Sequence, residues 1–183
     1  MGKIQTVAVY GSSMIQPDEP EYQAAYDVGK ALGMAGYTVM TGGYNGIMEA
    51  VSKGASEVKG HVVGVTTDVI DALRSSGPNQ WIVDEVRLPT LRERLMHLVL
   101  EADAYVAMPG GLGTLHELVT VWELIRVGDI PRRPIICYGD FWAKMLDGLY
   151  DSRYIHPGAW DYLKFAYTPQ DILDFLRGAE YAK

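Results

Sequence analysis

The chain has 183 residues, of which 48% are hydrophobic and 21% are charged, and its formal net charge is −7. This length is typical of one domain with a sizeable core, and the composition excludes a disordered or fibrous protein. The negative charge argues against a protein that neutralises many nucleic-acid phosphates, so we expect no nucleic-acid partner.

The first residues and the apolar segments indicate where in the cell the protein is expected. No stretch approaches the roughly 18 to 20 apolar residues of a membrane span, and the first residues lack the basic and apolar regions of a signal peptide. The single cysteine, Cys137, follows two isoleucines and is expected in the core, where it has no partner for a disulfide. We therefore expect a cytoplasmic protein without a membrane partner.

Segments with strand and helix patterns alternate along the chain, which is typical of a parallel sheet connected by helices. The expected strands are 4–10, 37–41, 61–66, 81–88, 104–108, 134–138 and 165–167. The expected helices are about 19–34, 47–54, 68–74, 90–102, 114–127, 141–150 and 169–177, and 75–79 is a loop by composition. The strand at 81–88 is the most polar and is expected near a sheet edge. We predict an α/β, Rossmann-like, doubly wound parallel sheet of about six to seven strands, with helices on both faces, forming a single domain over residues 1–183.

A glycine-rich loop at Pro109-Gly110-Gly111-Leu112-Gly113-Thr114 joins a buried strand to an amphipathic helix. Backbone N–H groups at such a helix N-terminus form a site for a phosphate or a carboxylate. Thr114 adds a hydroxyl group, and Glu117 adds a carboxylate about one turn into the helix. The alternative is that Thr114 and Glu117 form a capping box, in which the glutamate only satisfies a backbone donor.

Four features are expected at one edge of the sheet, because strand-to-helix loops of a parallel sheet all lie at its carboxyl edge, where such folds bind ligands. They are Gly11-Ser12-Ser13, Gly42-Gly43-Tyr44-Asn45-Gly46, the helix turn from Thr90 to Arg94, and the segment from Pro109 to Glu117. Their convergence predicts a site for a nucleotide-like ligand.

Arg94 lies in the first turn of its helix, where the helix dipole disfavours a cation. An arginine in such a place is a candidate for holding a phosphate or for orienting a glutamate. The alternative is a solvated side chain, which we favour for the neighbouring Arg92.

Several other chemistries lack their motifs. The phosphate-binding Gly-x-x-x-x-Gly-Lys-[Ser/Thr] sequence is absent, and Gly42-Gly43-x-x-Gly46 is not the dinucleotide fingerprint. Ser12 and Ser13 lack the context of a nucleophile elbow and are assigned to polar binding. The histidines show no metal-ligand spacing, so no metal is expected; they are His61, His97, His116 and His156.

Taken together, these residues resemble the family named after the plant LONELY GUY (LOG) proteins, phosphoribohydrolases that release a base from a nucleoside 5′-monophosphate. The segment from Pro109 to Glu117 matches the family's Pro-Gly-Gly-x-Gly-Thr-x-x-Glu, and the segment from Thr41 to Glu49 resembles its second glycine motif. Gly11-Ser12-Ser13 resembles its first loop, and Arg94 stands where the family has its arginine. The resemblance extends from about Thr6 to Arg177.

Members of this family are commonly labelled possible lysine decarboxylases. No lysine here stands at a strand end suited to a pyridoxal phosphate Schiff base, so we expect no cofactor. Two departures indicate a divergent branch: Arg94-Leu95 replaces the usual Arg-Lys pair, and His116 replaces the glutamate that often precedes the catalytic one.

The resemblance implies hydrolysis of the N-glycosidic bond of a nucleoside 5′-monophosphate, a cytokinin ribotide or an AMP-like nucleotide, to free base and ribose 5-phosphate. Glu117 and Arg94 are then the catalytic residues, Glu117 stabilising an oxocarbenium-like state and positioning water while Arg94 orients Glu117. The implied binding residues are Gly11, Ser12, Ser13, Gly42, Gly43, Asn45, Gly46, Met48, Pro109, Gly110, Gly111, Gly113 and Thr114.

Two other functions stay open at this point. Some relatives resemble carriers of molybdenum cofactor, so the same loops can serve a non-catalytic nucleotide or cofactor carrier. A ligand sensor that acts through a partner is the third reading. Because the family forms dimers, we expect a homodimer or a higher homo-oligomer, with the helix that contains Trp122 and the helix at 91–102 supplying the interface.

Overall fold

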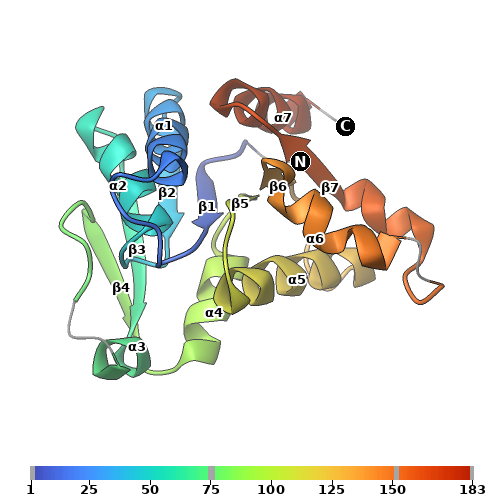
Figure 1. The fold of residues 1–183 in the computed structure, drawn as a ribbon, viewed down its shortest axis with the longest axis horizontal. Coiled ribbons are helices and arrows are strands. Elements are labelled where there is room, and N and C mark those ends of the chain that lie inside the picture. Colours follow the sequence, from blue (N-terminus) through green and yellow to red (C-terminus); the bar gives the residue numbers. More distant parts are fainter. Residues whose placement is uncertain (1–2, 74–76, 151–152, 182–183) are drawn as a thin grey trace.

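The computed structural model describes residues 3–73, 77–150 and 153–181 (Figure 1), so the predictions for residues 74–76 lie outside the described residues. Within these ranges seven strands form one sheet in the order β4-β3-β2-β1-β5-β6-β7, and every pairing is parallel. The strands are β1 (Thr6–Tyr10), β2 (Thr38–Thr41), β3 (Val62–Thr67), β4 (Asp84–Leu88), β5 (Ala104–Ala107), β6 (Ile135–Tyr138) and β7 (Leu163–Ala166). The predicted fold class is confirmed, and β4 is an edge strand as expected.

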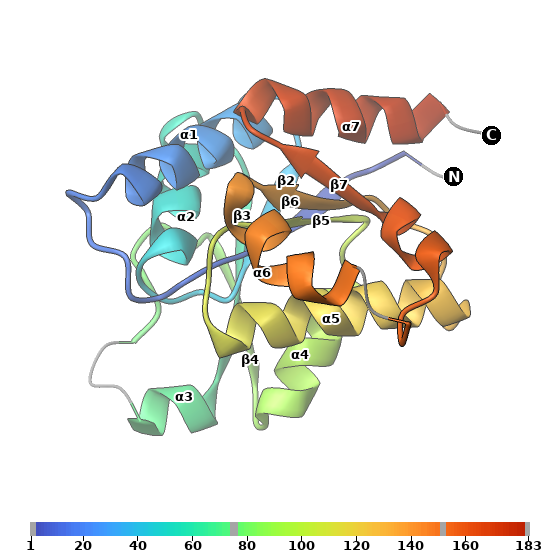
Figure 2. The ribbon, with the colours of Figure 1, turned by 45° about the vertical axis from the view of Figure 1, so that its right-hand side comes forward.

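Helices cover both faces of this sheet (Figures 1 and 2). They are α1 (Pro20–Met34), α2 (Ile47–Glu57), α3 (Asp68–Leu73), α4 (Leu91–Leu100), α5 (Leu112–Val127), α6 (Asp140–Tyr150), α7 (Pro169–Tyr181) and the 3₁₀ helix η1 (Pro157–Tyr162). Alternate strand residues point to opposite faces. Val7 and Val9 therefore pack under α1, α2 and α7, whereas Ala8 and Tyr10 pack toward α4, α5 and α6.

The chain changes direction across the sheet at β1. The strands β1 to β4 run outward to one edge, and α4 then returns the chain to the other side of β1, where Val7 pairs with Ala104 of β5. In open α/β sheets, ligands bind outside the carboxyl ends of the strands at such a switch point. A ligand site is therefore expected at the loops that follow β1 and β5.

Most elements differ from their predicted bounds by a few residues, such as α2, which ends at Glu57, and β7, which begins at Leu163; two differences have a clear local cause, and one element was not predicted. The strand expected from residue 81 begins only at Asp84, because Asn79 holds the chain in a turn: its side-chain oxygen accepts from Trp81 N at 3.1 Å. The helix expected after the glycines begins at Leu112, so Gly113 and Thr114 lie inside its first turn. The 3₁₀ helix η1 lacks the apolar periodicity that would have identified it.

The first turn of α4 is capped by a threonine. Thr90 is its N-cap, and the Thr90 hydroxyl oxygen accepts from Glu93 N at 3.2 Å while the hydroxyl donates to the Glu93 carboxylate at 2.6 Å. This cap fixes the first turn of α4, which places Arg94 one residue further on.

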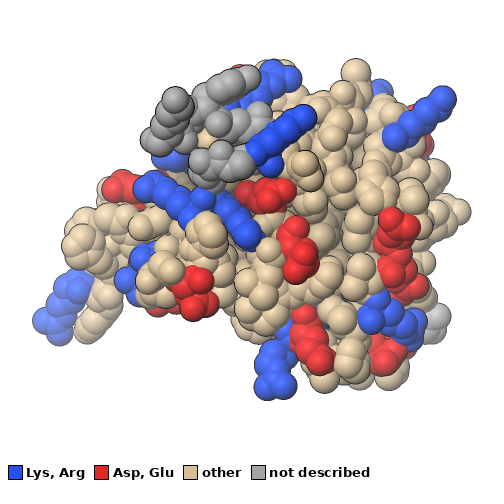
Figure 3. All heavy atoms as spheres, turned by 180° about the vertical axis from the view of Figure 1, so that it is seen from behind, with Lys and Arg blue, Asp and Glu red and all other residues tan. Residues whose placement is uncertain are grey.

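On the face opposite the view of Figure 1, acidic and basic side chains lie on a largely uncharged surface, with several basic ones gathered in the upper left part of the view (Figure 3). Among the described residues, no helix has the length and apolarity needed to cross a membrane.

Candidate active site at the switch point of the sheet

The carboxyl ends of β1 and β5 open into a cavity of about 290 Å³. It brings together many of the residues predicted from sequence, including the candidate catalytic pair Arg94 and Glu117. The full lining is Gly11, Ser12, Ser13, Met14, Tyr44, Met48, Ile70, Arg94, Gly111, Leu112, Gly113, Thr114 and Glu117.

The backbone of Ser12 joins the two glycine loops. Ser12 N donates to Pro109 O at 3.1 Å, and Ser12 O accepts from Ile47 N at 2.8 Å. Gly46, the N-cap of α2, has a φ of +70°, and a Cβ there would overlap Ser12 O. Only glycine permits both this positive φ and the close approach of Ser12 O, since other residues are strained at positive φ and carry a Cβ. The three loops therefore form one connected framework.

Several predicted binding residues belong to that framework and not to the cavity lining. They are Gly42, Gly43, Asn45, Gly46, Pro109 and Gly110. Gly42 shows the reason: a Cβ at this position would overlap the guanidinium group of Arg94. The glycine leaves room for the arginine.

The N-terminus of α5 forms part of the cavity wall. Gly111 is the N-cap and has no side chain with which to bond the first-turn amides, which also lack carbonyl partners within the helix. Thr114 is buried in that turn. These N–H groups and the helix dipole favour a phosphate or carboxylate beside Gly111, Gly113 and Thr114.

The capping-box alternative for Thr114 and Glu117 does not hold. Thr114 is the third residue of α5, whereas a capping box requires it at the N-cap, which is Gly111. The Glu117 carboxylate instead faces Arg94, with 3.6 Å between Glu117 Oε1 and Arg94 Nη1. Glu117 is thus available for a role other than helix capping.

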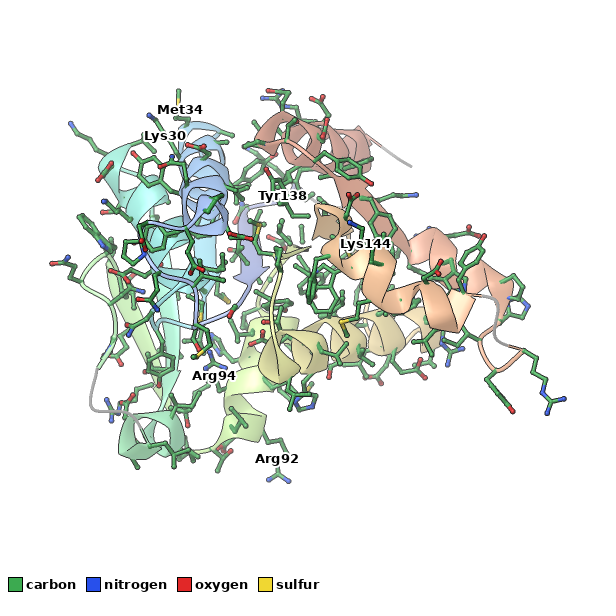
Figure 4. The ribbon with its side chains drawn as sticks, in the orientation of Figure 1. Lys30, Met34, Arg92, Arg94, Tyr138 and Lys144 are labelled. Carbon is green, nitrogen blue, oxygen red and sulfur yellow. The ribbon has the colours of Figure 1, made fainter. Side chains whose placement is uncertain are left out.

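Arg94 is buried and held from two sides by backbone carbonyl groups. Its Nε donates to Val65 O at 2.7 Å, and its Nη2 donates to Gly42 O at 3.0 Å. Figure 4 shows Arg94 pointing into the molecule, whereas Arg92 on the same helix points outward and is exposed. The charge of Arg94 is therefore fixed beside Glu117, while Arg92 is the solvated residue that the sequence indicated.

Burial sets the acidity of Glu117. Its side chain is only 12% exposed, and the loss of solvent raises its pKa from the ordinary 4.5 to about 7, against the opposing effect of Arg94. A carboxyl group with such a pKa exchanges protons near neutral pH. Titratable groups of this kind in a cavity are characteristic of functional sites.

Four residues of the lining were missed by the sequence-based site prediction, namely Met14, Tyr44, Ile70 and Leu112. Tyr44 and Leu112 lie within the glycine motifs and Met14 follows Ser13, so their neighbours gave a signal. Tyr44 is fully buried, and its ring centroid lies 5.7 Å from Cζ of Arg94, within the range of a cation–π contact. Ile70 belongs to α3 and has no motif of its own.

Fold and site together define an α/β protein with a helix N-terminus and a buried Arg–Glu pair beside a cavity at the switch point of a doubly wound sheet. A family model described as "Possible lysine decarboxylase" matches residues 48–176, and the chain belongs to this family, the LOG family. The predicted resemblance is thereby confirmed.

Known proteins similar to this chain agree with that assignment. It is 32% identical over 176 residues to the cytokinin riboside 5′-monophosphate phosphoribohydrolase of Mycobacterium tuberculosis, covering 92% of this chain and 91% of the relative. It is 30% identical over 173 residues to a probable enzyme of the same name from Oryza sativa subsp. japonica, covering 91% and 67%. The molybdenum cofactor binding protein of Rippkaea orientalis shares the fold, with a TM-score of 0.72, 20% identity and 98% of each chain covered.

Proposed function

We propose that this chain hydrolyses the N-glycosidic bond of a nucleoside 5′-monophosphate, a cytokinin ribotide or an AMP-like nucleotide, to free base and ribose 5-phosphate. The observation that supports this most strongly is the buried pair of Arg94 and Glu117, which faces the cavity about one and a half turns from the N-terminus of α5. The names of the relatives, which are phosphoribohydrolases of such nucleotides, support the same reaction.

The lining of the cavity supports the following placement of the ligand. The 5′-phosphate lies on the amides at Gly111, Gly113 and Thr114, because that end of the cavity favours an anion. The ribose then lies beside Glu117. The base extends toward Tyr44 and the apolar side chains beyond it, Met48 and Ile70.

The chemistry follows from this placement. The bond between C1′ and the base nitrogen breaks, its electron pair leaves with the base, and positive charge develops on the ribose. The Glu117 carboxylate stabilises that charge and accepts a proton from the water molecule whose oxygen attacks C1′, while the departing base takes up a proton. Arg94 keeps Glu117 in place and favours its ionised form.

The decarboxylase label of the family fits this cavity less well. A pyridoxal phosphate enzyme needs a lysine for the Schiff base, and among the described residues the lining contains an arginine but no lysine. The lining therefore favours glycosidic hydrolysis over decarboxylation of an amino acid.

We also propose that the chain acts in the cytoplasm as a homodimer or a higher homo-oligomer. The sequence analysis assigned the interface to the helix that contains Trp122 and to the helix at 91–102. Trp122 itself is buried, and its indole N–H donates to Ala159 O at 2.8 Å. These two helices, α5 and α4, still carry exposed apolar side chains, which are Leu91, Leu100, Leu112, Val119 and Val127. Sedimentation of the wild type against Val119→Glu tests the proposal, since a charge at an apolar interface should shift the protein toward the monomer.

The function is tested with a panel of nucleoside 5′-monophosphates that includes AMP and N6-isopentenyl AMP. Free base and ribose 5-phosphate are quantified by chromatography, and we expect them in equimolar amounts from at least one member. If no base is released and one nucleotide still raises the melting temperature, the protein is a carrier or sensor and the proposed reaction is wrong.

A further inference from the structure

Helix α3 (Asp68–Leu73) forms one wall of the cavity with very little hydrophobic anchoring. None of its residues is buried, and Leu73 is 82% exposed. Ile70 is the α3 residue that lines the cavity. Because apolar burial contributes so little here, polar contacts must hold α3 against the body of the protein.

Those contacts centre on Asp71. Its Oδ1 lies 2.8 Å from the Tyr44 hydroxyl, which donates to it, and its Oδ2 lies 2.8 Å from Nη2 of Arg87 on β4. The Tyr44 hydroxyl oxygen also accepts from Thr67 N at 2.9 Å, directly before α3 begins. We refer to these three residues, Tyr44, Asp71 and Arg87, as the latch. It joins α3 to the edge strand on one side and to the second glycine loop on the other.

A second acidic residue of α3 makes a useful contrast. Asp68 also pairs with Arg87, with 2.6 Å between Asp68 Oδ1 and Nε. However, the Asp68 side chain is 59% exposed, whereas that of Asp71 is only 17% exposed and contacts Tyr44. Exposed ion pairs contribute little because water screens them, so Asp71 should hold α3 far more firmly than Asp68 does.

The latch connects directly to the candidate active site. Tyr44 lines the cavity, and its ring lies beside the guanidinium group of Arg94. Through its hydroxyl group Tyr44 reaches Asp71, one residue after Ile70. The position of Ile70 in the cavity is thus set by a side chain that itself does not line the cavity.

We propose that Asp71 is a positioning residue, which fixes α3 so that Ile70 contacts the base of the bound nucleotide. This proposal rests on the proposed function for the nature of the ligand. Ile70 belongs to α3, whereas the phosphate is placed at the N-terminus of α5, another wall of the cavity. The latch should therefore govern binding of the base and leave the bond-breaking step at Glu117 unchanged.

The test compares Asp71→Ala and Tyr44→Phe with the matched control Asp68→Ala, which removes an α3 carboxylate that also pairs with Arg87. For a nucleotide that the wild type hydrolyses, we expect Asp71→Ala and Tyr44→Phe to raise KM about tenfold, with kcat of Asp71→Ala within about twofold of wild type. Asp68→Ala should leave both constants within about twofold. The affinity for ribose 5-phosphate, which has no base, should be unchanged in Asp71→Ala.

Hydrogen exchange of the free protein provides a readout that needs no turnover. Amides of residues 67–73 should exchange about tenfold faster in Asp71→Ala than in Asp68→Ala. If the wild type releases no base from any nucleotide, the proposed function fails. The exchange comparison alone then tests whether Asp71 holds α3 in place. Equal exchange in the two variants, or a fall in kcat with unchanged KM in Asp71→Ala, would overturn the proposal.

Discussion

Arg94 presents Nη1 to the Glu117 carboxylate at 3.6 Å while its other nitrogens are committed to the backbone, Nε to Val65 O and Nη2 to Gly42 O. The guanidinium group is therefore fixed by one carbonyl group within β3 and by another in the loop that follows β2. Because both side chains are almost fully buried, neither charge is well solvated, and each depends on the other. This relationship leads to the following predictions.

The activity should titrate near neutral pH. Burial raises the pKa of Glu117 to about 7, and the carboxylate is the form that stabilises positive charge on the ribose. We expect kcat/KM to rise with pH and to reach half of its plateau near pH 7, since kcat/KM reports groups of the free enzyme. The measurement is kcat/KM between pH 5 and 9; a plateau already complete at pH 5.5 would contradict the role given to Glu117.

Glu117 should also make stability depend on pH. Its folded-state pKa of about 7 lies above the ordinary 4.5, so between these values the folded protein binds more protons and loses stability as pH rises. The Glu117→Gln variant lacks this contribution. Relative to that variant, the wild type should lose about 2–3 kcal/mol of unfolding free energy between pH 5 and 8. Urea denaturation at several pH values measures the difference, and parallel pH dependence of the two proteins would disprove the raised pKa.

Removal of the Arg94 charge should affect both the stability of the protein and the pKa of Glu117. Arg94→Met leaves the carbonyl groups of Val65 and Gly42 without their donors and leaves Glu117 without a countercharge. We expect a loss of about 2–4 kcal/mol of unfolding free energy. The pKa of Glu117 should rise above its wild-type value, because Arg94 lowers it.

The control for this variant is Arg92→Met on the same helix. Arg92 is exposed and points away from the cavity (Figure 4), so its replacement should change stability by no more than about 0.5 kcal/mol. Denaturation curves and the pH dependence of kcat/KM are measured for both variants. Equal effects at the two positions would mean that Arg94 is not the fixed partner of Glu117.

Gly42 should be required for the position of Arg94. A Cβ at this residue would overlap the guanidinium group, so Gly42→Ala should displace Arg94 and lower kcat/KM by at least about tenfold. Gly148→Ala in α6 is the matched control, because a Cβ there has no atom within 4 Å. A helical glycine replaced by alanine should leave activity unchanged and add up to about 1 kcal/mol of stability. Full activity in Gly42→Ala would show that the overlap is relieved without moving Arg94.

Local patterns were sufficient for the order of the strands and α-helices, because the central strands are buried apolar runs and the more polar β4 lies at an edge. They were not sufficient where the position of a residue depends on contacts with residues far away in the sequence. Gly42 was expected at the ligand, but its place is set by Arg94, which is far away in the sequence. Gly113 suggested a loop, yet it lies in the first turn of α5, where the amides need no carbonyl partner within the helix.

The α3 wall was the least predictable part of the candidate site. None of its six residues is buried, so no hydrophobic pattern marks Ile70 as a lining residue. The contacts that position it come from Tyr44 and Arg87, which belong to other loops and strands. By contrast, Arg94 and Glu117 could be selected from sequence, since one is a cation in a first helical turn and the other follows a glycine-rich loop.

The most direct measurement of the central claim is base release by Glu117→Gln, made beside nucleotide binding by the same protein. Glutamine keeps the shape of the side chain but can neither accept the proton of water nor stabilise the ribose charge. We predict that kcat falls by at least about 10³-fold, while the dissociation constant of AMP stays within about threefold of the wild-type value. Turnover close to the wild-type rate with intact binding would contradict the assignment of Glu117 as the catalytic carboxylate.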